Sequence, residues 1–211
     1  MTMQKQVSAD HYNFGRYLTI KRWSSIWHQL QQVLDLHAES VLELGPGPGT
    51  FKVVAEHLGL HVETFDIDPE LKPDHVGDAR SMKFGDNSFD IVCAFQMLEH
   101  LEYSSALEVI AEMSRVAKEY VVISLPDSRV LWKYSFYLPR LGQRTFFLPR
   151  PSLNRRLHKF DGEHHWEINK KGYELGNVIQ DLSAASNAKL LRTFRAEENT
   201  FHRFFVFKAS R

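Results

Sequence analysis

The chain has little of several features that define other classes of protein. Only one of its 211 residues, Cys93, is a cysteine, which excludes an intrachain disulfide. Basic and acidic residues balance at 26 each, so net charge does not indicate nucleic acid or a membrane as partner. No apolar run reaches the roughly 18 residues of a membrane span, and no signal-peptide pattern follows the start. We therefore expect a cytoplasmic protein of one domain, residues 1–211, with no transmembrane segment.

Short apolar segments alternate with amphipathic ones along most of the chain. The expected strands span residues 40–44, 61–66, 74–77, 89–95, 119–125, 189–194 and 201–208. The expected helices span residues 22–36, 50–58, 104–116 and 170–182. This alternation predicts an α/β fold, a parallel sheet with helices on both faces. Cys93, inside a continuous apolar run, is expected to be buried, and Trp23 and Trp27 are expected to pack the first helix onto the core.

Three alternating glycines, Gly45, Gly47 and Gly49, follow the first expected strand directly and precede a helix. Glycine permits positive φ and close approach of a ligand to the backbone, so this turn predicts a site for a nucleotide-like ligand. The sequence lacks the Gly-Lys-Ser/Thr of a P-loop, and its spacing differs from the dinucleotide fingerprint. Glu43, two residues before the first glycine, would repel a pyrophosphate and suits a ligand that carries a positive charge.

With Glu43 and this glycine spacing, the sequence resembles the class I S-adenosylmethionine-dependent methyltransferases. Three later segments agree in order and spacing: Thr64–Asp68, Val76–Ala79, and the stretch from Phe84 to the Leu-Glu-His-Leu of residues 98–101. The resemblance is close over residues 40–126. It implies a Rossmann-like, mostly parallel sheet of seven strands with helices on both faces and the last strand antiparallel.

The resemblance also implies a cofactor, S-adenosyl-L-methionine, and residues that bind it. Asp66, 21 residues after Gly45, would accept both ribose hydroxyls, and Ile67 would pack on the adenine. Asp78 would bind the adenine amino group, and the Ala79 N–H a ring nitrogen. Asp66 and Asp78 as simple turn residues are the alternative.

Two further contacts follow from the same resemblance. Gln96 would face the methionine part of the cofactor. The N-terminal region, residues 1–38, would close over the cofactor. Its possible contacts are Tyr12, Arg16, Tyr17 and Arg22.

The candidate catalytic residues are histidines. His100 is a possible base, although an ordering role for the loop beneath the cofactor is favoured. His164 and His165 lie in a segment dense in titratable groups, residues 158–167, and are candidates for substrate contact or acid–base catalysis. The histidine spacing fits no regular zinc pattern and class I methyltransferases mostly need no metal, so we expect none.

Residues 128–167 form an insertion between the fifth strand and the next helix. Residues 128–160 carry eight basic side chains, no acidic one and seven aromatic residues, six of them interleaved with the basic ones in residues 132–147. One interpretation is a lid over an acidic or phosphorylated small substrate, held by Arg155 and Arg156. Contact with anionic lipid or a partner protein is the second, and a solvated loop the third. Nucleic acid is disfavoured because the rest of the chain is acidic.

The sequence thus predicts an S-adenosylmethionine-dependent methyltransferase that acts on a small molecule by in-line displacement. Such a reaction depends mainly on aligning donor and acceptor in a dry pocket, and a general base is needed only for some acceptors. Two alternatives stay open: a non-catalytic module that binds the same cofactor, and a nicotinamide-dependent oxidoreductase.

Overall fold

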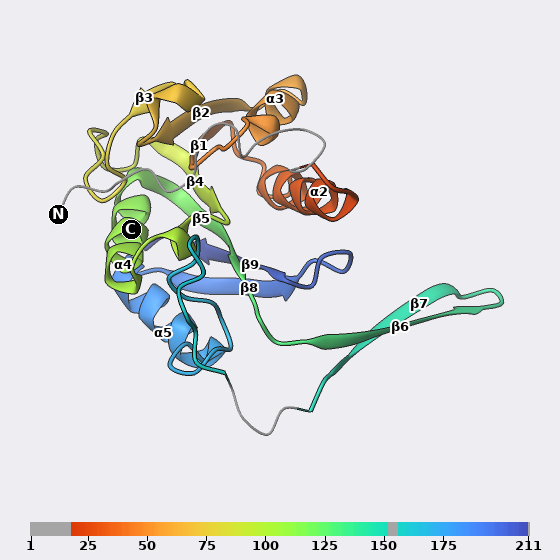
Figure 1. Ribbon diagram of the computed structural model, residues 1–211. Helices are drawn as coiled ribbons and strands as arrows, with labels where there is room; N and C mark the ends of the chain where they lie inside the picture. Colours follow the sequence, from red (N-terminus) through yellow and green to blue (C-terminus); the bar gives the residue numbers. More distant parts are fainter. Residues whose placement is uncertain (1–17, 152–155, 211) are drawn as a thin grey trace.

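The computed structural model describes residues 18–151 and 156–210, and Figure 1 shows its elements in the order of the chain. Tyr12, Arg16, Tyr17 and Arg155 lie outside the described residues. One sheet has seven strands: β1 (Ser40–Leu44), β2 (His61–Asp66), β3 (His75–Val76), β4 (Phe89–Phe95), β5 (Ala117–Pro126), β8 (Lys189–Arg195) and β9 (His202–Lys208). In the described part of the chain four α-helices accompany it: α2 (Ile20–Leu34), α3 (Thr50–His57), α4 (Tyr103–Val116) and α5 (Leu175–Ser186). Short 3-10 turns, η2 (Pro69–Leu71) and η3 (Leu98–His100), follow β2 and β4.

The strand order is β3-β2-β1-β4-β5-β9-β8, and β9 is antiparallel to both of its neighbours. The predicted seven-stranded, mostly parallel sheet with an antiparallel last strand is therefore confirmed. The chain leaves β1 toward β2 on one side, and β4 returns to pair with β1 on the other. In open α/β sheets such a reversal, at the carboxyl ends of the strands, is where ligands bind.

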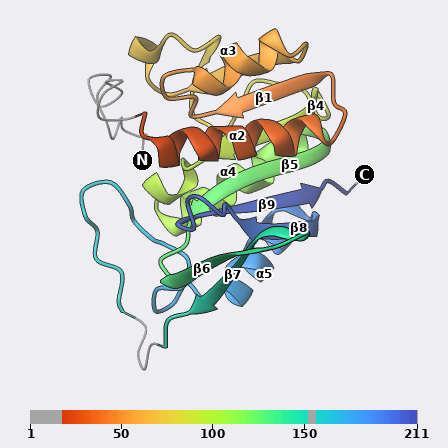
Figure 2. The same ribbon diagram turned by 90° about the vertical axis from the view of Figure 1, so that its right-hand side faces the viewer.

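The helices cover both faces of the sheet (Figure 2). One core layer packs under α4 and α5, and the other under α2 and α3. Cys93, in β4, is fully buried in the second layer as expected. Among the described residues no helix is long and apolar enough to cross a membrane.

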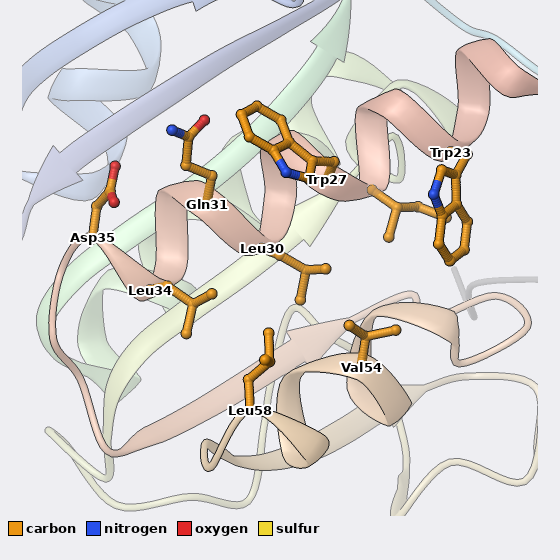
Figure 3. A pocket seen from close by; sticks show the side chains of 9 residues that line it. Trp23, Trp27, Leu30, Gln31, Leu34, Asp35, Val54 and Leu58 are labelled. Atoms are coloured by element: carbon orange, nitrogen blue, oxygen red, sulfur yellow. The ribbon is translucent and has the colours of Figure 1, made fainter.

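The first helix buries a different set of residues from the one that the sequence predicts. Thr19 caps α2 by accepting a hydrogen bond from the Arg22 N–H, and Ile26, Leu30 and Val33 face the core. Trp23 and Trp27 are 52% and 54% exposed, so the prediction that they pack the helix onto the core was wrong. They lie one helical turn apart at the rim of a surface pocket between α2 and α3 (Figure 3).

The start of the last helix also differs from the prediction. The sequence predicts a helix from Lys170, whereas α5 begins at Leu175. Asn169 and Gly172 have φ values of 67° and 91°, which no helix accommodates. Ile168 instead forms a parallel bridge with Asp127, directly after β5, so the segment before α5 pairs with the end of this strand.

Much of the insertion forms a hairpin that sequence reasoning did not predict: β6 (Leu131–Leu138) and β7 (Gly142–Pro149), paired antiparallel. It projects from the body on the side of the sheet that α2 covers (Figures 1 and 2). Residues opposite each other share a face, so one face is almost wholly apolar. Arg144, opposite Phe136, is the one charged residue of this face. Its large apolar members are all 37–47% exposed: Trp132, Tyr134, Phe136, Leu138, Phe146 and Leu148.

A buried ion cluster fixes the base of this insertion. The Asp127 carboxylate, at the end of β5, accepts hydrogen bonds from Arg195 Nε at 2.8 Å and Arg203 Nε at 2.7 Å. Its other oxygen accepts from Asn169 Nδ2 at 2.8 Å and from the Arg129 N–H at 3.1 Å. Asp127 thereby joins the first residues of the insertion to β8 and β9 and to the segment before α5.

Candidate functional site

The three glycines form the turn that leads from β1 into α3. Their φ values are 67° for Gly45, 53° for Gly47 and 71° for Gly49, in the left-handed region that favours glycine. Gly45 N donates to the Phe65 carbonyl at 3.0 Å, which extends the β1–β2 pairing by one residue. The backbone then turns away at the edge where the strand order reverses, as the sequence predicts.

Glu43 lies beneath this turn and is nearly inaccessible. It is 3% exposed, and its Oε2 has no hydrogen-bond partner among the described residues. Burial raises the pKa of Glu43 to about 8, although the charge of Lys52 opposes this rise. A buried carboxyl without a partner is unfavourable, and a cationic ligand above it would remove the penalty.

The next predicted cofactor residues follow neighbouring strands. Asp66 ends β2, and its Oδ1 accepts a hydrogen bond from the Asp68 N–H at 2.8 Å, while Ile67 is half-buried beside it. Asp78 follows β3 and forms an ion pair with Arg80, with Nη2–Oδ2 at 2.6 Å. This hydrogen bond to Arg80 lowers the pKa of Asp78. Ala79 is buried behind it. The fold thus places these residues along one edge of the sheet.

Gln96 immediately follows β4 and has a φ of 54°, unusual for a residue with a side chain. Its backbone N–H donates to the Ser124 carbonyl at 3.0 Å, and its amide nitrogen lies 3.3 Å from Ser124 Oγ. The positive φ ends the strand sharply and turns the chain into η3. Strain of this kind is characteristic of functional sites, and it occurs next to the glycine turn.

A second group of polar residues gathers at the same edge, around η3. Glu99 is fully buried, and neither oxygen of its carboxyl group has a hydrogen-bond partner in the described part of the chain. His100 Nδ1 lies 2.9 Å from the Glu163 carbonyl, and His165 N donates to the Glu99 carbonyl at 2.8 Å. His164 Nδ1 lies 3.1 Å from Glu167 Oε1. The second half of the insertion therefore attaches directly to η3.

Burial controls the electrostatics of this group. It raises the pKa of Glu99 to about 7 and lowers the pKa of His100. Burial alone would lower the pKa of His164, but the hydrogen bond to Glu167 and the nearby carboxyl groups raise it. His202, at the start of β9, is also buried, and its pKa falls to about 3. Four titratable groups with shifted pKa values lie at one sheet edge, two of them buried and two half-buried, which indicates a functional site.

Sequence reasoning found only part of this group. His100 and His164 were candidates and are brought together, with ring centroids 5.2 Å apart. His165 packs instead against Phe160, and Arg156 is exposed. Glu99 and His202 were missed as site residues. Glu99 could have been found from its position next to the candidate His100 in the Leu-Glu-His-Leu segment. Nothing in the sequence indicates that His202 belongs to the site.

Comparison with known proteins agrees with this geometry. The model of a family described as "Methyltransferase domain" matches residues 14–165. The chain belongs to this family. The match confirms the resemblance to class I S-adenosylmethionine-dependent methyltransferases, and it argues against a nicotinamide-dependent oxidoreductase. No curated protein matches the sequence significantly.

Solved structures share the fold of this methyltransferase at low identity. The PH0226 protein of Pyrococcus horikoshii OT3 has a TM-score of 0.60 at 16% identity, over 97% of this chain and 100% of its own. Magnesium protoporphyrin IX methyltransferase from Synechocystis PCC 6803, with bound SAM, has 0.59 at 12%, over 96% and 90%. A Burkholderia thailandensis 1,6-didemethyltoxoflavin-N1-methyltransferase, with that compound and S-adenosylhomocysteine bound, has 0.61 at 12%, over 96% and 85%.

Proposed function

We propose that this methyltransferase transfers the methyl group of S-adenosylmethionine to a small-molecule acceptor by in-line displacement. The observation that carries the proposal is the buried carboxyl group of Glu43 beneath the glycine turn, whose Oε2 has no hydrogen-bond partner within residues 18–151 and 156–210. A phosphate-bearing cofactor would bring a second negative charge to this carboxyl, whereas a sulfonium and an ammonium group would neutralise it.

The residues present fit that cofactor from end to end. Gly45, Gly47 and Gly49 would admit its amino-acid part close to the backbone, with Glu43 below and Gln96 beside it. Asp66, at the end of β2, would accept the ribose hydroxyls through its carboxylate. The half-buried Ile67 would cover the adenine, and Asp78 and the Ala79 N–H would bind its edge. When bound, the cofactor supplies the activated methyl group, and these residues orient it.

The acceptor would lie between the glycine turn and the group around η3. His164 is part of that group, so it remains our first candidate for a substrate contact, with His100 beside it. His165 and the exposed Arg156 are candidates only if an acidic or phosphorylated acceptor extends toward the insertion. This arrangement suits a small molecule, because segment 163–165 lies across η3.

The test is a direct measurement of binding followed by turnover. The purified protein should bind S-adenosylhomocysteine in a calorimeter, and Glu43→Gln should weaken that binding. Incubation with S-adenosylmethionine and a panel of metabolites should yield a product heavier by one methylene group. Absence of cofactor binding would overturn the proposal. Tight binding with no transfer to any metabolite would instead favour a non-catalytic module that binds the same cofactor.

The hairpin supports a second role, contact with an anionic lipid surface. Its apolar face is exposed, Tyr134 and Phe146 stack on it with centroids 5.2 Å apart, and no acidic residue occurs from 128 to 160. Aromatic side chains flanked by basic ones are typical of segments that lie at a membrane interface. We propose that this face touches the membrane, which replaces the interpretation of the hairpin as a lid.

Sedimentation with lipid vesicles tests this role. The protein should sediment with vesicles that contain phosphatidylglycerol and much less with pure phosphatidylcholine. Phe136→Asp, on the apolar face, should abolish sedimentation, whereas Thr145→Asp, on the opposite face, should weaken it only slightly. Equal losses in the two variants, or no sedimentation of the unaltered protein, would contradict the role.

A further inference from the structure

The group around η3 contains a feature that methyl transfer alone does not explain. Glu99 is fully buried, and both of its carboxyl oxygens lack a hydrogen-bond partner among the residues described. Leaving a buried carboxyl group unsatisfied is costly, and proteins retain such groups where a ligand satisfies them. One ligand atom each from Glu99, His100 and His164 lies within 4.8 Å of the other two.

The two histidines are held in the state that a metal ligand requires. A carbonyl oxygen only accepts hydrogen bonds, so the contact with Glu163 makes Nδ1 of His100 a donor. The carboxylate of Glu167 holds Nδ1 of His164 in the same way. In each neutral ring Nε2 then carries the lone pair. Metal-binding histidines are usually oriented like this, with the second ring nitrogen donating to a carbonyl or a carboxylate.

The ligand atoms of a neighbouring triad, Asp161, His164 and Glu167, also lie close to one another. The carboxylates of this triad, however, already accept hydrogen bonds or form ion pairs. Asp161 Oδ1 accepts from the N–H groups of Glu163 and His164, at 3.0 and 2.8 Å. Glu167 contacts both His164 and Lys170. Asp161 therefore stabilises the loop, and Glu167 orients His164. Glu99, whose carboxyl oxygens have no hydrogen-bond partner among the described residues, is left as the acidic ligand.

We propose that Glu99, His100 and His164 form a binding site for one divalent transition-metal ion. Two imidazole nitrogens and one carboxylate suit Zn²⁺, Mn²⁺ or Fe²⁺ better than Mg²⁺ or Ca²⁺, which prefer oxygen ligands. The sequence spacing led to the opposite expectation, because His164 reaches η3 only through the folding of the insertion. Binding an ion would satisfy both oxygens of Glu99 and fasten segment 163–165 to η3.

Three protein ligands leave coordination positions for another molecule. In this respect the inference rests on the proposed methyl transfer: the acceptor would bind the ion through an oxygen atom. The ion would fix the position of that oxygen and lower the pKa of its hydroxyl group, so that the proton is released to water and no protein general base is required. Acceptors with a hydroxyl group next to a second oxygen are the expected class.

Metal binding can be measured without any methyl donor, so its failure is distinguishable from failure of the proposed function. Metal-free protein is titrated with Co²⁺, which reports its coordination by visible absorption, and Zn²⁺ is added to displace it. We expect one equivalent of Co²⁺ to bind and Zn²⁺ to replace it. Glu99→Gln and His164→Asn should each weaken Co²⁺ binding at least about 100-fold, with S-adenosylhomocysteine affinity retained.

Two variants serve as matched controls. His165→Asn removes the adjacent imidazole, which packs on Phe160, and should bind Co²⁺ like the unaltered protein. Asp161→Asn keeps the oxygen that accepts the two backbone hydrogen bonds and should also leave binding unchanged. Circular dichroism checks that each variant is folded. No saturable Co²⁺ binding, binding that survives Glu99→Gln, or loss in Asp161→Asn would each overturn the assignment.

Discussion

Gly45 lies directly against Met97, so the glycine turn and the segment after β4 are in contact. A Cβ atom placed on Gly45 would come within 2.6 Å of Met97 Cγ and 3.1 Å of Met97 Cβ. The first distance is closer than side chains tolerate, and the backbone of Gly45 also has a φ of 67°. Two independent features therefore require glycine at position 45: the positive φ of its backbone and the close packing of Met97.

Gly45→Ala should therefore destabilise the protein and disturb the cofactor turn. The left-handed backbone costs about 1–2 kcal/mol for alanine, and displacement of Met97 adds about 1 kcal/mol. We expect a clear fall in Tm and weaker calorimetric binding of S-adenosylhomocysteine. Gly49→Ala is the matched control, since Gly49 has a φ of 71° with nothing within 4 Å of the added atom. Equal losses in the two variants would show that the Met97 contact is unimportant.

Asp66 should contribute directly to cofactor affinity. Its Oδ1 supports the turn through the Asp68 N–H, and the charged carboxylate would accept the ribose hydroxyls. Asp66→Ala should weaken cofactor binding by about 1–3 kcal/mol, as expected for charge-assisted hydrogen bonds. Asp66→Asn keeps an oxygen for the turn and separates the two roles. If Asp66→Asn binds S-adenosylhomocysteine as tightly as the unaltered protein, the ribose assignment is wrong.

The elements that the sequence predicts well are those whose local pattern matches their burial. The glycine turn, the continuous apolar run of β4 and the strand–helix alternation all come from short-range signals. The family resemblance then supplied the number of strands and the antiparallel last strand. Trp23 and Trp27 misled because an aromatic residue fits a helical stripe equally well at its centre or at its edge.

The remaining features depend on contacts between distant parts of the chain. His164 meets His100 only because the insertion folds back over η3, and the spacing of the histidines carries no trace of this. Glu99 is unusual because it is an acidic residue that is completely buried, and the local sequence does not indicate this burial. The apolar face of the hairpin results from the pairing register of β6 with β7. In the sequence, basic residues separate the apolar residues that form this face.

Glu43 should make cofactor binding depend on pH. Burial raises the pKa of Glu43 to about 8, and a bound cation would lower it. Affinity for S-adenosylmethionine should therefore increase as the pH rises from 6 to 8, because less work is needed to ionise Glu43. Calorimetry at each pH gives the affinity of the unaltered protein and that of Glu43→Gln. The ratio of these two affinities cancels the effect of protonation of the cofactor itself. A ratio that does not change with pH would contradict this role.

The same residue should limit the stability of the empty protein at alkaline pH. A carboxyl whose pKa is raised from 4.5 to about 8 contributes most stability below pH 4.5, and this contribution disappears as the pH rises through 8. Glu43→Gln, which is always neutral, should therefore raise Tm at pH 8.5 but change it little at pH 5. The difference should be on the order of 4 kcal/mol, or about 8–16 °C. Thermal unfolding with no cofactor added measures it.

Asp127 should be the most important ionic residue for stability. Its side chain is fully buried between Arg195 and Arg203, which are 7% and 16% exposed, and these hydrogen bonds hold its pKa below 3.8 in spite of burial. Its contribution should be present above pH 3.8 and be lost as the pH falls through the lowered pKa.

Asp127→Asn keeps a hydrogen-bond acceptor for Asn169 but leaves two buried cations unpaired. Removing one partner of a buried ion pair costs about 3–5 kcal/mol, so Tm should fall by roughly 10 °C or more. Glu119→Gln is the matched control, because its pair with Lys208 is 42% exposed on both sides and should be worth less than about 1 kcal/mol. Urea unfolding near pH 7 compares the two variants. Similar free energies of unfolding would mean that Asp127 does not anchor the insertion to β8 and β9.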